Sequence, residues 1–175
     1  MKQKGTFLFL CFLAYAVIGW YYEVVLEVFI YQWGFSNRGF LFGPYCPVYG
    51  FGAVLLLFCL SKIKDQRKWY SPLLVFLGTV FLTTALELAT SYIMEAVIGH
   101  WQWDYTKYAL QFDGRIALNP SIRFGLGGLF FLYVVQPVLE KIFACLGENR
   151  CTKLAAVLFG VVFIDFIATM VYRVL

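Results

Sequence analysis

Charged residues are scarce in this 175-residue sequence. Asp, Glu, Lys and Arg make up only 14% of it, whereas a soluble globular domain has about 25%. Hydrophobic residues account for 62%, and the mean hydropathy is +0.76. This composition excludes an ordinary soluble domain and predicts a polytopic membrane protein, with residues 1–175 forming a single integral membrane domain.

Other absences restrict the chemistry. There is no GxxxxGK[ST] phosphate loop, so the chain cannot hydrolyse ATP by that route alone. It has one histidine, His100, and five cysteines that form no CxxC pair. We therefore expect no metal site and no bound cofactor. The net charge of +4 comes from basic residues between apolar runs, so we expect no nucleic-acid partner.

Long apolar runs are abundant. A membrane-spanning helix needs about 20 mostly apolar residues, and none of the runs has the two-residue alternation of a membrane β-strand. The predicted fold is an all-α polytopic membrane helix bundle of about five transmembrane helices. The runs cover residues 6–32, 42–60, 71–98, 116–139 and 154–175.

The basic residues predict the topology. Cytoplasmic loops of membrane proteins are enriched in Lys and Arg, and placing the N-terminus inside and the C-terminus outside puts most basic residues on the cytoplasmic side. We therefore expect an N-in, C-out, multi-pass protein of the cell membrane. Residues 34–49 and 99–115 then lie outside, whereas 62–70 and 140–153 form plain charged cytoplasmic loops.

Glycine and proline are concentrated where the second run begins, in SNRGFLFGPYCPVYGFG. Such a composition disfavours a regular helix start and predicts a re-entrant or kinked segment near residues 35–50. Irregular backbone at membrane depth must line a cavity or be covered by protein. Asn37, Arg38 and Tyr49 are therefore candidate site residues. The alternative is an ordinary outer loop followed by a glycine-kinked helix.

Carboxylates in two of the runs are the strongest candidates for a site. Glu23 shares a helical face with Trp20, and Glu87, Ser91 and Glu95 follow at four-residue spacing. A central acidic residue costs about 2.5 kcal/mol or more on insertion. The carboxylates should therefore face the protein interior and have partners. Glu95 and Glu27 have an alternative interpretation as residues of the water interface.

Arginines are the candidate partners, because a guanidinium binds a carboxylate or phosphate in bidentate fashion. We predict that the carboxylates of the first and third runs converge with Arg38 and Arg115 on one pocket. Arg123 and Asp165 are a candidate structural ion pair. HWQWDY is either an aromatic lid or an interfacial belt. The predicted substrate-binding set is Glu23, Asn37, Arg38, Tyr49, Glu87, Ser91, Glu95, Trp103, Asp104 and Arg115.

Four motifs also resemble a known family. GWYYEV, NRGFLFGPYCPVYGFG, ELATSYIMEAVIGHWQWDY and GRIALNPSIRFGLGG, which is followed by QPVL, are similar to small bacterial membrane proteins described as type IV ABC-transporter components of the CmpB type. The resemblance covers residues 12–139 and implies transport and a location in the bacterial plasma membrane. Because the chain has no nucleotide-binding part, it also implies a homodimer or separate partner subunits.

Three functions are compatible with these patterns. The first is a transporter or transport subunit for a small solute or ion, with a carboxylate and arginine site open to the extracytoplasmic side. The second is an intramembrane enzyme that acts on a lipid-linked or extracytoplasmic substrate, with glutamates as acid and base and arginines as an anion clamp. The third is a non-catalytic membrane scaffold. The sequence identifies no catalytic residue, and the partners it predicts are membrane lipid and a small-molecule or ion ligand.

Overall fold

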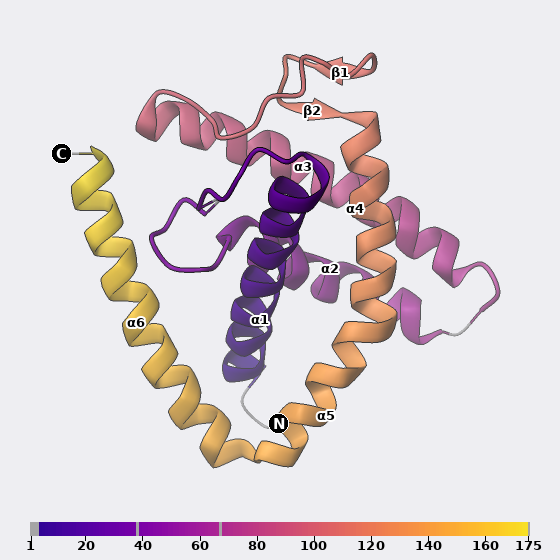
Figure 1. The fold of residues 1–175 in the computed structure, drawn as a ribbon. Coiled ribbons are helices and arrows are strands. Elements are labelled where there is room, and N and C mark those ends of the chain that lie inside the picture. The colour runs from indigo at the N-terminus through magenta and orange to yellow at the C-terminus, as the bar shows by residue number, and fades with distance from the viewer. Residues whose placement is uncertain (1–3, 38, 67, 175) are drawn as a thin grey trace. The chain divides into compact units, whose positions relative to one another are not determined.

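The computed structural model describes residues 4–37, 39–66 and 68–174, and it is mainly helical (Figure 1). Within these residues, five helical stretches are long and apolar enough to cross a membrane, so the predicted all-α membrane fold is confirmed. The elements are α1 (Lys4–Val25), η1 (Leu26–Ile30), α2 (Pro47–Asp65), α3 (Ser71–Ile98), β1 (Gln111–Phe112), β2 (Ile116–Ala117), α4 (Leu118–Phe130), η2 (Phe131–Val135), α5 (Gln136–Leu146) and α6 (Glu148–Val174).

Helix boundaries follow local chemistry more than hydropathy. The third run is predicted correctly, since α3 begins at Ser71, has a proline in its first turn, and ends before Gly99, which has a φ of 79°. The expected charged loop at residues 140–153 is wrong. α5 and α6 are separated only by Gly147, whose φ is 78°. Charged residues continue a helix as readily as apolar ones do, so only this glycine interrupts it.

The segment before α2 is irregular, as its glycines and prolines predict. α2 begins at Pro47, later than the apolar run suggested, because a proline is favourable in the first turn of a helix and unfavourable within one. The re-entrant depth of this segment and the N-in, C-out topology stay predictions.

The contacts divide the chain into two compact units, residues 1–54 with 140–175 and residues 55–139. Each has its own packing, and a single domain over the whole chain stays a prediction. In the first unit, α1 packs against α6. A buried cluster of Ala16, Leu41 and Tyr45 joins α1 to the irregular segment, and the Cys46 N–H donates to the Ala16 carbonyl at 2.9 Å.

Small residues bring helices close together in both units. A Cβ atom added to Gly50 of α2 would lie 2.6 Å from the carbonyl oxygen of Phe12 in α1. In the second unit, α3 packs against α4. A Cβ atom added to Gly125 would lie 2.6 Å from the Phe76 ring. Such close approach is typical of membrane helices, which associate through packing contacts and not through the hydrophobic effect.

A short β-hairpin precedes α4 and was not predicted. β1 and β2 pair antiparallel, with Phe112 opposite Ile116. At the turn, Asp113 and Gly114 have φ values of 54° and 66°, and the Arg115 N–H donates to the Phe112 carbonyl. Asp-Gly is a preferred pair where two successive residues need a positive φ. This turn places Arg115 outside the strand pairing.

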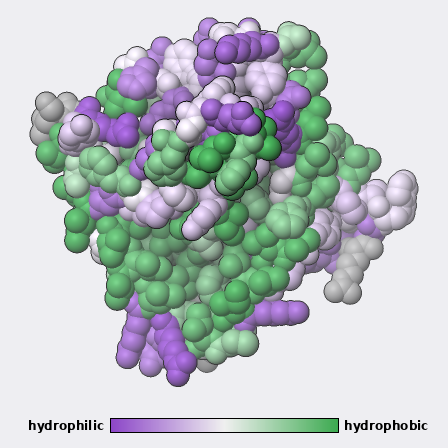
Figure 2. All heavy atoms as spheres, in the orientation of Figure 1, coloured by the Kyte–Doolittle hydropathy of each residue, from purple (hydrophilic) through white to green (hydrophobic). Residues whose placement is uncertain are grey.

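The exposed surface is rich in large hydrophobic side chains, as expected of helices that face lipid. Apolar residues cover much of the surface seen in Figure 2. On α6, for example, Val157, Phe163 and Ile164 are 65%, 53% and 70% exposed.

Candidate functional site

The second unit contains a cluster of polar contacts around Arg115, which is only 4% exposed. Its Nη2 lies 2.6 Å from the Oε2 of Glu95, its Nε lies 2.9 Å from the Oδ2 of Asp113, and its Nη1 lies 3.4 Å from the hydroxyl of Ser91. Burial alone would lower the pKa of Arg115. The hydrogen bond that the guanidinium donates to Asp113 raises the pKa instead, and the hydrogen bond that it donates to Glu95 adds to this effect. The guanidinium is therefore charged and already engaged by two carboxylates.

Two aromatic rings flank the same guanidinium. Its central carbon lies 3.9 Å from the ring centroid of Trp101 and 4.2 Å from that of Tyr92, distances at which a cation is attracted to a ring face. The indole N–H of Trp103 donates to the Arg115 carbonyl oxygen at 2.8 Å. The aromatic residues of HWQWDY therefore also have a specific packing role, beyond that of a general interfacial belt.

Glu87 is buried in α3, with 7% of its surface exposed. The hydroxyl of Tyr105 donates to Glu87 Oε1 at 2.7 Å. Tyr105 comes from the loop before β1, and its backbone N–H donates to the Gly114 carbonyl at 2.9 Å. This loop therefore donates a hydrogen bond to a buried carboxylate of a membrane-length helix, and the lid interpretation stays a prediction.

Asp104 makes a local contact in the loop, and its predicted part in substrate binding stays a prediction. Its carboxylate is exposed and accepts the Thr106 N–H at 2.9 Å. That backbone hydrogen bond is the main reason that the pKa of Asp104 lies below its usual range. Asp104 therefore shapes the loop locally.

The first unit holds the other predicted carboxylate. Glu23 of α1 accepts a hydrogen bond from the hydroxyl of Tyr49 in α2, so these two predicted site residues are in contact. Glu27 is 5% exposed and accepts the hydroxyl of Ser36 at 2.7 Å. Glu27 therefore faces protein and has a partner, and its position relative to the water interface stays a prediction.

Asn37 organises the irregular segment. Its side-chain oxygen accepts the indole N–H of Trp20 at 2.8 Å, and its amide donates to the carbonyls of Leu41 at 3.2 Å and Phe42 at 2.9 Å. The side chain holds its own loop in place and ties it to α1. Arg38, the next predicted site residue, lies outside the described residues.

Asp165 of α6 anchors the same segment. It accepts hydrogen bonds from the backbone N–H groups of Phe42 and Gly43, at 3.2 and 2.9 Å, and from the hydroxyls of Tyr45 and Thr169. The predicted partner Arg123 belongs to the other unit, so the Arg123–Asp165 ion pair stays a prediction.

The predicted set therefore forms two local groups. Glu87, Ser91, Glu95, Trp103 and Arg115 gather in the second unit, whereas Glu23, Asn37 and Tyr49 lie in the first. The convergence of these two groups on one pocket stays a prediction. Sequence reasoning missed several contributing residues, although the Asp-Gly pair directly before Arg115 signals the turn that presents it. The residues missed are Ser36, Tyr92 and Asp113, with Trp101 and Tyr105 proposed only as parts of an aromatic lid.

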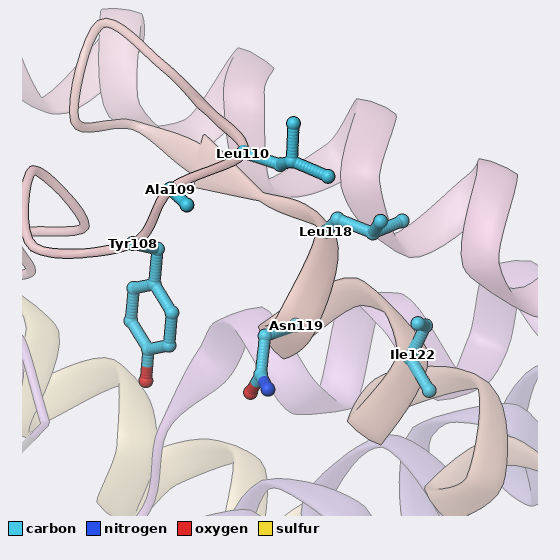
Figure 3. Close-up of a pocket in the computed structure, with 6 residues that line it drawn as sticks. All are labelled: Tyr108, Ala109, Leu110, Leu118, Asn119 and Ile122. Atoms are coloured by element: carbon cyan, nitrogen blue, oxygen red, sulfur yellow. The ribbon is translucent and has the colours of Figure 1, made fainter.

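A hollow of about 320 Å³ lies beside the hairpin (Figure 3). Leu110, Leu118 and Ile122 give it an apolar wall, and Tyr108 and Asn119 add polar groups. It lies at the start of α4, and its lining includes none of the predicted site residues.

A helical membrane protein with buried carboxylates is the class that the fold and these contacts define. Comparison with known families is more specific. A family model described as "Putative ABC-transporter type IV", of the CmpB type, matches residues 10–170. The chain belongs to this family and is a transport-related membrane protein. Searches of curated proteins and of solved structures found no match.

The thiol of Cys46 should be unreactive. Cys46 is 4% exposed, and burial, followed by the nearby charge of Glu23, raises the pKa of its thiol to about 12. Since the thiolate is the reactive form, a maleimide at pH 8 should label the exposed Cys145 much faster than Cys46. Peptide mass spectrometry measures both sites, and equal labelling rates would contradict the burial of Cys46.

Proposed function

We propose that this protein is the membrane subunit of a bacterial cell-membrane transporter and that it binds a small cation or protons through Glu87, with Glu23 as a second carboxylate. The observation that supports this most is the buried carboxylate of Glu87 in a membrane-length helix, hydrogen-bonded by the Tyr105 hydroxyl from the loop before β1. Acidic residues inside membrane helices are costly and typically serve ion or proton pathways.

The chemistry of the partners favours a cation over an anion. Glu87 and Glu23 both accept hydrogen bonds from tyrosine hydroxyls, and carboxylate oxygens are groups that bind protons and small cations. Arg115 is engaged by Glu95 and Asp113. In this conformation its guanidinium would therefore be a poor clamp for a substrate anion, which weighs against the phosphate-clamping enzyme.

Energy for transport would come from outside this chain. The sequence has no phosphate-binding GxxxxGK[ST] loop, so a transporter of the ABC type would need a separate ATP-hydrolysing subunit. We therefore propose a complex with partner subunits in which this chain provides the membrane path.

Replacing Glu87 by Gln tests ion binding without requiring those partners. A ligand that binds only the folded state raises the melting temperature. We expect Na⁺, K⁺ or a lower pH to raise the melting temperature of the purified wild-type protein in detergent at constant ionic strength. The Glu87→Gln variant should lose this response, because its side chain is neutral at every pH.

Glu148→Gln is the matched control, since Glu148 is exposed at the start of α6. It should respond to ions as the wild type does. The proposal would be contradicted if wild type and Glu87→Gln responded identically to every ion and pH. A reduced baseline stability of Glu87→Gln with a preserved response would instead assign Glu87 to the scaffold of the fold.

A further inference from the structure

The loop and hairpin between α3 and α4, residues 99–117, which we call the outer segment, are attached to α3 chiefly through one side chain. We infer that the outer segment is a closing element over Glu87 and that Arg115 is the latch that holds it shut. This rests on the proposed function, in which Glu87 is the group that binds the ion.

Arg115, the latch, contacts three residues of α3 that follow Glu87 in the helix. Its guanidinium reaches Ser91 and Glu95 through hydrogen bonds and lies over the ring of Tyr92. These residues lie one to two turns nearer the end of the helix than Glu87. Arg115 therefore fixes the outer segment to the part of α3 that leads to the buried carboxylate.

Arg115 also binds the outer segment internally. It contacts Asp113 and Trp101, and its carbonyl accepts the Trp103 indole. The outer segment therefore has its strands, its aromatic residues and its attachment to α3 organised by one residue. Removing the guanidinium would release its contacts with α3, Asp113 and Trp101 together, whereas the backbone carbonyl would still accept the Trp103 indole N–H.

Tyr105 connects the latch to Glu87. Its N–H donates to the carbonyl of Gly114, the residue before Arg115, and its hydroxyl donates to Glu87. The position of the hairpin therefore determines whether the phenol reaches the carboxylate. Displacing the hairpin would withdraw Tyr105 and uncover Glu87.

Three features of the outer segment favour reversible closure over Glu87. The two carboxylates that hold Arg115 have exposed side chains, 43% for Glu95 and 61% for Asp113, and water competes effectively for exposed ion pairs. The hairpin has two residues in each strand, and such an isolated hairpin is marginally stable. Gly99, with its φ of 79°, begins the outer segment and provides a pivot.

Hydrogen exchange of the purified full chain tests the latch directly. In Arg115→Gln, the amides of residues 99–117 should exchange about tenfold or more faster than in the wild type, because local opening controls their exchange. The amides of residues 4–30 and 148–173 should keep their wild-type rates. Lys107→Gln is the matched control, since it removes one positive charge from an exposed residue of the same segment, and its exchange should match that of the wild type.

Accessibility of Glu87 provides the second readout. Dicyclohexylcarbodiimide is an apolar reagent that modifies carboxyl groups, and mass spectrometry locates the modification. Labelling of Glu87 should be faster in Arg115→Gln and in Tyr105→Phe than in the wild type. Labelling in Lys107→Gln should be unchanged.

Two results would overturn the latch. One is wild-type exchange of residues 99–117 in a folded Arg115→Gln protein. The other is faster exchange throughout residues 71–139, which would make Arg115 a general stabilising residue. If Arg115→Gln does not fold, Trp101→Ala and Arg115→Lys apply the same criteria, because each removes part of the contact set. The ion response of Glu87→Gln is a separate measurement, so the proposed function and the latch can fail independently.

Discussion

Gly50→Ala should markedly destabilise the first unit of this protein. The added methyl group would lie 2.6 Å from the Phe12 carbonyl oxygen, which belongs to the backbone of α1 and cannot rotate away. Overpacking of this kind typically costs about 1–3 kcal/mol. We expect a lower melting temperature in detergent and a lower yield of folded protein, measured by thermal unfolding and size-exclusion chromatography.

Gly160→Ala is the control for this substitution. Gly160 lies in α6 of the same unit, and a Cβ atom there would have no neighbour within 4 Å among the described residues. Because alanine favours helix more than glycine does, this variant should be as stable as the wild type or slightly more stable. Equal stability of the two variants would contradict the close contact between α1 and α2.

Asp165→Asn should be the second most damaging substitution outside the proposed site. The carboxylate of Asp165 accepts four hydrogen bonds, two of them from the backbone of the irregular segment. Asparagine has one acceptor oxygen and brings two donors of its own, so at least one donor loses its partner. Each such loss costs about 1–3 kcal/mol.

Asp165→Asn should lower the stability of the whole protein and should also loosen the irregular segment before α2. We expect a lower melting temperature and faster hydrogen exchange of residues 39–46 in Asp165→Asn. Asp65→Asn is the control, because the side chain of Asp65 is 69% exposed. Normal exchange of residues 39–46 in Asp165→Asn would show that Asp165 does not hold the segment.

Hydropathy predicts where this chain crosses a membrane better than where its helices end. The run at residues 71–98 coincides with α3, whose ends are marked by Pro72 and Gly99. The runs at 116–139 and 154–175 stop at charged residues, whereas the helices extend to Leu146 and begin at Glu148. A hydropathy window detects the hydrocarbon core, and a helix can extend beyond it without penalty.

The acidic residues of the candidate site were predictable, but only some of their partners were. Helical spacing correctly groups Glu87, Ser91 and Glu95, and the prediction that Arg115 meets carboxylates is confirmed for Glu95. Hydroxyl donors, however, were not predicted for Glu87, whose donor is Tyr105. The chain has 12 tyrosines, and only tertiary structure determines which of them reaches a carboxylate.

The π-helical segment η1 makes the length of the first span as important as its composition. The Tyr31 N–H donates to the Leu26 carbonyl, five residues earlier, so this turn holds one residue more than an α-helical turn does. One residue corresponds to about 100° of rotation, and it lies between the contacts of Glu23 and the segment that carries Ser36. Insertions or deletions here would turn everything that follows, so this part of the chain should tolerate substitution far better than a change in residue count.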